Sequence, residues 1–179
     1  VKHTENIIKK HIPDTKDILV IEGGETRNDT IMNAISFIEG TYGLFEDTII
    51  VTHDSVRPFV SHRIISENIR YAKEYGACDT VVAATDTIVR SDNGEYITDI
   101  PERKFMYQGQ TPQTFQAKML KDMFVALSDE EKKILTDAAK ILVLKGKKVY
   151  LVQGEVSNIK ITYPFDIRVA QTLLQGDKI

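Results

Sequence analysis

Apolar runs of strand length alternate with helical patterns in the first half of the sequence, and this order constrains the fold more than any other feature. The runs at residues 18–21, 49–52 and 78–84 are almost continuously apolar or β-branched, as in strands buried on both faces. Residues 31–38 and 61–75 instead place apolar side chains on one helical face. The alternation predicts an α/β, Rossmann-like fold with a mostly parallel sheet, right-handed crossovers and helices on both faces.

Composition limits the function classes. The 179 residues carry a net charge of -3, with 27% charged residues, and no basic face points to nucleic acid. No apolar run reaches the length of a membrane span, and residues 1–5 do not look like a signal peptide. We expect one domain over residues 1–179, in the cytoplasm, without a nucleic-acid or membrane partner. The single cysteine, Cys78, opens an apolar strand and is interpreted as a buried, unreactive thiol.

The alternation breaks after residue 84. Residues 85–90 and 95–100 are predicted to be two strands, and the Asn93-Gly94 pair between them is typical of a tight hairpin turn. A compact sheet does not explain this excursion, so we expect residues 86–110 to form a protruding β-hairpin arm that covers the active site or reaches a second subunit. The amide- and hydroxyl-rich run at 108–114 is interpreted as a polar loop.

The remaining sequence returns to alternating elements. Residues 115–127 and 129–145 are predicted to be helices, 149–152 a strand and 158–162 a short extended segment. Pro164 is well placed in the first turn of a final helix.

Charged side chains follow the run at 49–52 directly. Asp54 and Arg57 come next, and Pro58 prevents the strand from continuing. Ligands bind at the carboxyl ends of strands in open α/β sheets, where a carboxylate can hold a metal or orient a substrate and an arginine can bind phosphate oxygens. A local ion pair that braces a turn explains the same spacing equally well.

Two further features have both a functional and a structural interpretation. Gly23 and Gly24 separate a strand from a helix, so backbone amides there can approach an anionic ligand. A tight turn with Asn28 or Asp29 as helix cap is the alternative. Lys160 interrupts an apolar run, either because a half-exposed strand alternates or because its charge is directed at a phosphate.

Six motifs together resemble the polyol-phosphate cytidylyltransferases, which couple CTP to a polyol phosphate. This family comprises the ribitol-5-phosphate cytidylyltransferases of teichoic-acid synthesis and the 2-C-methyl-D-erythritol 4-phosphate cytidylyltransferases of isoprenoid synthesis. The resemblance covers essentially the whole chain, in the order Gly23-Gly24-Glu25-Thr26-Arg27, His53-Asp54-Ser55-Val56-Arg57-Pro58, Asp86-Thr87, Gln110-Thr111-Pro112-Gln113, Thr136-Asp137-Ala138 and Asn158-Ile159-Lys160-Ile161-Thr162.

The resemblance implies roles for individual residues. The CTP site would comprise Gly24, Glu25, Thr30, Asp54, Ser55 and Lys160. The polyol phosphate would contact Arg57, Thr111, Thr136 and Thr162 of one subunit together with Thr87 and Arg103 of the other, because the arm crosses into the partner of a homodimer in this family. Lys160, Asp54 and Arg57 would be the catalytic residues.

The implied reaction is in-line attack of the polyol phosphate on the α-phosphorus of CTP, with release of pyrophosphate. Mg²⁺ would be bound mainly through the phosphates of CTP, without a metal site made by the protein. Positioning and charge neutralisation would supply the rate.

Between the two acceptors, the resemblance favours D-ribitol 5-phosphate, which gives CDP-ribitol. Residues 54–59, 107–115 and 127–132 look more like the teichoic-acid branch, and the isoprenoid branch more often has alanines where Ser55 and Val56 stand. A ribulose-5-phosphate reductase would then be a candidate partner. The alternatives are methylerythritol 4-phosphate as acceptor and a non-catalytic, sugar-phosphate-binding remnant.

The sequence departs from the family pattern at its start. Members begin with a strand and a glycine-rich loop whose arginine and lysine surround the triphosphate, and Val1 comes after these elements. We expect a protein with only these residues to be inactive and poorly stable.

Overall fold

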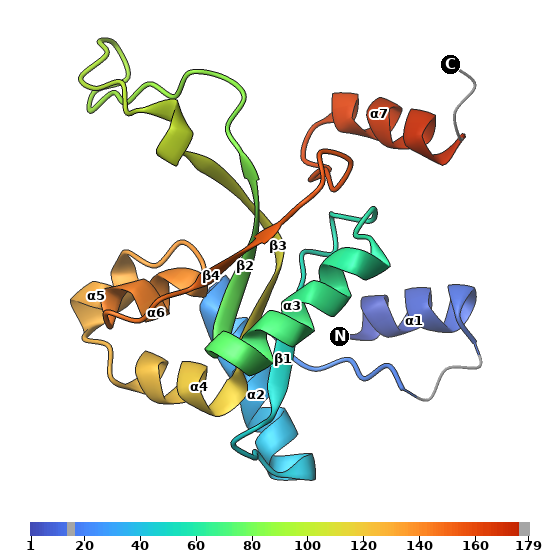
Figure 1. Ribbon diagram of the computed structural model, residues 1–179. Helices are drawn as coiled ribbons and strands as arrows, with labels where there is room; N and C mark the ends of the chain where they lie inside the picture. The colour runs from blue at the N-terminus through green and yellow to red at the C-terminus, as the bar shows by residue number, and fades with distance from the viewer. Residues whose placement is uncertain (14–16, 176–179) are drawn as a thin grey trace.

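One open four-stranded sheet organises the protein, as the computed structural model of residues 1–13 and 17–175 shows (Figure 1). The helices are α1 (Lys2–His11), α2 (Arg27–Tyr42), α3 (His62–Tyr75), α4 (Ala117–Val125), α5 (Asp129–Lys133), α6 (Ala139–Leu144) and α7 (Pro164–Leu174), with a 3₁₀ turn at Arg103–Phe105. The strands are β1 (Ile49–Thr52), β2 (Ala77–Ala83), β3 (Tyr107–Gln116) and β4 (Tyr150–Gln153). Within the described residues, none of the helices combines the length and apolar character needed to cross a membrane.

The strand order is β1-β3-β2-β4, and it corrects one sequence-based prediction. β2 pairs in parallel with β4, whereas β3 pairs antiparallel with both β1 and β2, so β1, β2 and β4 share one direction. The predicted polar loop at 108–114 is wrong, because these residues lie in β3 at the centre of the sheet. Their polar side chains find partners there: the buried Thr114 hydroxyl donates to the Asn68 side chain at 3.3 Å.

Helices cover both faces of the sheet, as expected. α3 packs across one face, where Ala72 meets Cys78 and Val152. On the other face α2, α4 and α6 enclose the larger core, which includes Ile35, Phe115 and other apolar residues. Successive residues of a strand point to opposite faces, so the residues next to Cys78, including Asp79, face the α2 side.

Two expected elements differ from the structure. Residues 18–21 are not a strand, because this segment pairs with no strand in the described part of the chain. The helix expected over 129–145 is two helices, α5 and α6. The break follows from local capping: the Asp137 carboxylate accepts a hydrogen bond from the Lys140 amide at 2.9 Å and starts a new helix.

The arm protrudes from the sheet between β2 and β3 (Figure 1). It spans residues 84–106, so residues 107–110 of the expected arm belong to β3. The two regular strands predicted for it are reduced to a single bridge between Arg90 and Asp99. The turn forms where the sequence predicts it, with Gly94 at φ 78° and the Asn93 side chain accepting from the amides of Glu95 and Tyr96.

Candidate active site

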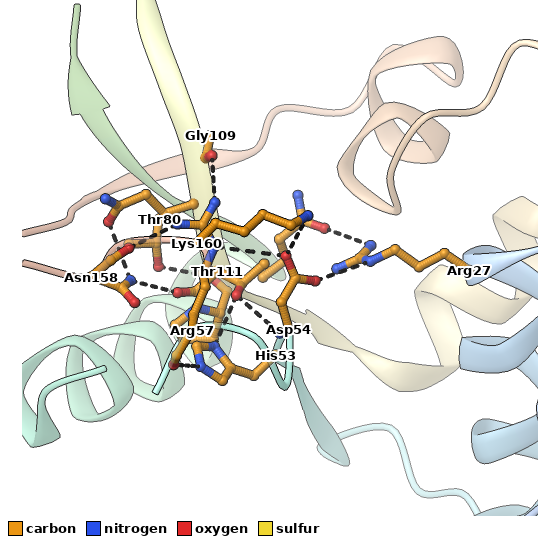
Figure 2. Close-up of polar contacts among 12 residues, drawn as sticks. Arg27, His53, Asp54, Arg57, Thr80, Gly109, Thr111, Asn158 and Lys160 are labelled. Atoms are coloured by element: carbon orange, nitrogen blue, oxygen red, sulfur yellow. Dashed lines mark hydrogen bonds and ion pairs between the residues drawn. The ribbon is translucent and has the colours of Figure 1, made fainter. Parts of the chain in front are cut away.

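Asp54 lies at the centre of a cluster of three cations (Figure 2). Its carboxylate oxygens are 3.2 Å from Lys160 Nζ, 3.5 Å from Arg27 Nε and 3.7 Å from Arg57 Nε. Burial of the carboxyl group favours its neutral form, but Lys160, Arg27 and Arg57 outweigh this effect and lower the pKa of Asp54. One carboxylate among three cations leaves a net positive cluster that suits phosphate groups.

The loop that follows β1 holds Asp54 in place. The Asp54 amide donates to the Thr111 hydroxyl at 3.1 Å, and this hydroxyl lies 2.9 Å from Nδ1 of His53. The other ring nitrogen of His53 lies 2.9 Å from the Arg57 carbonyl oxygen, which can only accept. In neutral His53 the proton therefore lies on Nε2, and Thr111 donates to Nδ1. These bonds fasten the loop to β3.

Arg57 connects three segments. Its guanidinium group donates to the carbonyl oxygen of Asn158 at 2.8 Å and to that of Gly109 at 3.4 Å, and its side chain is only 10% exposed. Burial lowers the pKa of Arg57, and the charges of Asp54 and Asp79 offset part of this effect. An arginine stays protonated under these conditions, so Arg57 supplies a fixed positive charge.

The segment after β4 carries Lys160 to Asp54. Asn158 is fully buried, and its side-chain amide donates to the Thr111 carbonyl oxygen at 2.8 Å. The Ile161 amide donates to the Val56 carbonyl oxygen at 2.8 Å. Lys160 lies between these two anchors, outside any strand, so alternation along a half-exposed strand does not explain its position.

Two cavities adjoin at this cluster, and Arg27, Asp54 and Lys160 line both of them. The larger, of about 330 Å³, is also lined by Thr30, Ile31, Thr52, His53, Ser55 and Val56. The smaller, of about 170 Å³, is also lined by Arg57, Gly109, Gln110, Thr111, Gln113, Thr136 and Asp137. The charged residues therefore stand at the boundary between two spaces.

The cavities separate the expected residues by their expected ligand. Thr30 and Ser55, which are expected to bind CTP, line the larger cavity. Arg57, Thr111 and Thr136, which are expected to bind the polyol phosphate, line the smaller one. Asp54 and Lys160 line both, as suits groups near the reacting phosphates.

Other expected residues lie outside both cavities. The amide of Gly24 donates to Thr30 Oγ1 at 3.0 Å, and a Cβ at Gly24 would come within 2.2 Å of Asp29 Cβ, so glycine permits a close approach to α2. The neighbouring Glu25 is exposed. The helix cap is Thr26, in a capping box with Asp29.

Three more expected residues have neighbours of a different kind. Thr162 donates its amide and hydroxyl to Asp166 in the first turn of α7. Thr87 and Arg103 lie on the arm, where Arg103 donates to the Thr85 carbonyl oxygen at 2.9 Å. The arm points away from the cavities of its own chain (Figure 1).

Several site residues were missed by sequence reasoning. Arg27, Gln110, Gln113 and Asp137 line the smaller cavity, and each stands inside a motif that was recognised without a role for that residue. Asp79 carried a different signal, since a carboxylate inside an apolar strand is rarely accidental.

The donor groups present do not build a site for Mg²⁺. The described residues contain no group of three or more His, Cys, Asp or Glu side chains that could hold a metal ion. Both oxygens of Asp54 already face cations. Magnesium is commonly held by substrate phosphates, water and one or two carboxylates.

Comparison with known proteins agrees with this arrangement. The family model for 2-C-methyl-D-erythritol 4-phosphate cytidylyltransferase (IspD) matches residues 1–176. The structure of 4-diphosphocytidyl-2C-methyl-D-erythritol synthase from Anaerococcus prevotii DSM 20548 is similar with a TM-score of 0.82 and 29% identity, over 97% of this chain and 78% of that one.

Two further solved structures are similar over slightly less of the chain. The 2-C-methyl-D-erythritol 4-phosphate cytidylyltransferase of Francisella tularensis gives a TM-score of 0.79 at 27% identity, over 89% of this chain and 73% of that one. The enzyme of the same description from Thermus thermophilus gives 0.72 at 26% identity, over 91% and 78%. The chain belongs to the 2-C-methyl-D-erythritol 4-phosphate cytidylyltransferase (IspD) family and is a nucleotidyltransferase of the cytidylyltransferase type.

Proposed function

We propose that this protein transfers CMP from CTP to a five-carbon polyol phosphate and releases pyrophosphate. The observation that carries the proposal is the pair of adjoining cavities with Arg27, Asp54 and Lys160 at their boundary. CTP would occupy the larger cavity and the polyol phosphate the smaller one. Such an enzyme would work in the cytoplasm, where CTP is made.

The chemistry needs little from the protein except position and charge. A phosphate oxygen of the polyol attacks the α-phosphorus of CTP, a new P–O bond forms, and the bond to the β-phosphate breaks. Lys160 and Arg27 would neutralise charge at the boundary where this exchange occurs, and Arg57 would bind the incoming phosphate. Asp54 keeps these cations at fixed positions before substrate arrives, which is the preorganisation that phosphoryl transfer exploits. Any Mg²⁺ would be held mainly by the phosphates of CTP.

Methylerythritol 4-phosphate is the acceptor that the comparisons support. The matching family model and the similar solved structures carry this substrate in their names. The expected preference for D-ribitol 5-phosphate has weaker support than this alternative. It stays the second candidate because Ser55 and Val56 replace the alanines more usual in the isoprenoid branch, and both line the larger cavity.

The deciding experiment is pyrophosphate release by the full-length protein with CTP and Mg²⁺, offered each polyol phosphate at equal concentration. We expect turnover with one acceptor at least ~100-fold more efficient than with the other, since a site built for hydroxyl groups discriminates strongly against a mismatch. A preference for ribitol 5-phosphate would assign the second candidate and direct attention to a reductase that supplies it. Failure of both acceptors together with failure to bind CTP would overturn the proposal in favour of a non-catalytic sugar-phosphate-binding role.

We further propose that the arm completes the site of a second subunit. Large apolar side chains are exposed on it, with Tyr96 71% and Phe105 64% accessible, and such surfaces are typical of protein contacts. Thr87 and Arg103 would thereby reach the partner's polyol phosphate. Arg103→Ala should then raise the KM for polyol phosphate more than the KM for CTP.

Subunit mixing tests the shared site directly. Lys160→Ala damages the cavity and Arg103→Ala damages the arm, so each homodimer would be impaired. If sites are shared, equal mixing after dissociation restores about a quarter of the wild-type sites, because half of the dimers are mixed and each has one intact site. Activity no higher than the average of the two variants would contradict a shared site.

A further inference from the structure

A chain of polar contacts leads from the smaller cavity into the sheet. Arg27 donates through its guanidinium group to the Gln113 side-chain oxygen at 3.2 Å, and Gln113 Nε2 donates to an Asp79 carboxylate oxygen at 3.0 Å. Gln113 is only 3% exposed and pairs with Asp79 across β3 and β2, so both side chains lie on one face. Asp79 does not line the cavity; it can act there only through Gln113.

The chemistry of the two outer groups fixes the direction of these bonds. An ionised carboxylate only accepts hydrogen bonds, and a guanidinium group only donates them. The amide of Gln113 satisfies both when its nitrogen faces Asp79 and its oxygen faces Arg27. If the amide were reversed, its NH₂ group would face the donors of Arg27 and its oxygen would face a carboxylate oxygen.

We propose that Asp79 is a positioning residue, which rests on the proposed function: it orients the Gln113 amide so that Gln113 holds Arg27 at the boundary of the two cavities. The contact matters because Arg27 has a long side chain that is 35% exposed, and its ion pair with Asp54, at 3.5 Å, is loose. A buried acceptor on the opposite side restricts the positions that Arg27 can take before substrate binds.

The surroundings make this orientation dependent on pH. Burial raises the pKa of Asp79 to about 6; Gln113 and Arg27 oppose the shift, and Asp137 adds to it. Arg57 and the thiol of Cys78 also interact with its charge. The other oxygen of Asp79 is buried and has no hydrogen-bond partner among the described residues. Protonated Asp79 has a donor as well as an acceptor, so it no longer imposes one orientation on Gln113.

The first test needs no substrate. In the full-length protein, the side-chain NH₂ resonances of Gln113, identified by their loss in Gln113→Glu, should shift with pH with a midpoint near pH 6. Asp79→Asn should remove this titration because asparagine does not ionise, whereas Asp47→Asn, at an exposed position, should keep it. Absence of the titration in the wild type would overturn the inference, whatever the enzyme's substrate proves to be.

The second test uses kinetics. Asp79→Asn should raise the KM for polyol phosphate about 3- to 10-fold at pH 8, roughly the effect of one hydrogen bond, with a smaller change in the KM for CTP. The ratio of variant to wild-type KM should approach one below pH 6, where wild-type Asp79 is itself protonated; the ratio cancels the titration of the substrate. A constant ratio, or no effect at pH 8, would contradict the proposal.

Stability separates positioning from a structural role. A carboxyl group whose pKa is raised on folding contributes stability below its unfolded pKa, and this contribution is lost as the pH rises through its folded value. Asp79→Asn should therefore not lower the Tm at pH 7.5. A weaker KM that simply tracked a lower Tm would overturn the proposal.

A reciprocal exchange provides the sharpest comparison. Gln113→Glu alone places two carboxylates against each other and should impair polyol phosphate binding. The double variant Asp79→Asn/Gln113→Glu restores complementary groups with the amide and the carboxylate exchanged. The introduced amide at position 79 donates to the introduced carboxylate at position 113, which accepts from Arg27. Binding by the double variant should exceed that of the Gln113→Glu variant, and failure of this rescue would count against the orientation mechanism.

Discussion

Lys160 Nζ lies 3.2 Å from Asp54 Oδ2, although the two residues follow strands at opposite edges of the sheet. Asp54 follows β1, and Lys160 follows β4 on a segment fastened to the loop by the bond between Ile161 and Val56. Figure 2 shows Lys160 and Arg27 reaching the Asp54 carboxylate from different elements. Folding therefore creates the pair of cavities and their charged boundary in one step.

Lys160→Ala is expected to lower kcat by roughly 100-fold, because it removes a preorganised charge at the reacting phosphates. Its side chain is 48% exposed, so its pair with Asp54 contributes little to stability, less than about 1 kcal/mol. Steady-state kinetics beside thermal unfolding would check both statements. Lys148→Ala, at another exposed lysine, is the matched control. Normal turnover accompanied by a large fall in Tm would make Lys160 a structural residue.

Asp54→Asn should reduce turnover and alter the dependence of stability on pH. The pKa of Asp54 is lowered in the folded protein, so its ionised form contributes stability above the unfolded pKa, and this contribution disappears as the pH falls through the folded value. The difference in unfolding free energy between wild type and variant should therefore be larger at pH 7 than at pH 2.5. Urea titrations at both pH values measure it, and a difference independent of pH would contradict this account.

Arg57→Lys should impair both binding and stability. A lysine keeps the charge but cannot donate simultaneously to the carbonyl oxygens of Asn158 and Gly109 as the guanidinium group does. We expect the unfolding free energy to fall by about 1–3 kcal/mol and the KM for polyol phosphate to rise. Arg168→Lys, at an exposed position of α7, should change neither quantity. An unaltered KM would remove Arg57 from the substrate site.

Cys78 should not react with thiol reagents while the protein is folded. Burial, and then the charge of Asp79, raises the pKa of the Cys78 thiol to about 12, so about one molecule in ten thousand carries a thiolate at pH 8. A colorimetric thiol assay should detect almost no reaction in buffer and one thiol per chain in denaturant. Stoichiometric reaction of the folded protein would show that the strand opens readily.

Local sequence patterns predicted most of the fold because they reflect local physics. The cap of Ser61 and the glycine at position 76 bound α3, and Pro164 begins α7, as expected. β1 and β2 also lie where their apolar runs predicted them. Motif resemblance added Asp54, Arg57 and Lys160, which the structure brings together.

Patterns failed where an element depends on distant partners. β3 looked like a polar loop because its buried Gln113 and Thr114 have amide and hydroxyl groups, which are satisfied only by side chains from other segments. Conversely, residues 18–21 have a strand pattern but no pairing strand in the described structure. Backbone pairing is a property of two segments, and one segment alone cannot specify it.

The sequence by itself determined the α/β class, the helices with their caps, the protruding arm and the family. Only the tertiary structure decided that β3 runs antiparallel between β1 and β2, that three cations converge on Asp54, and that Asp79 contacts Arg27 through Gln113. The physical reason is range: helix caps and turns are set by neighbours in the chain, whereas charge clusters and hydrogen-bond direction depend on groups that meet only after folding.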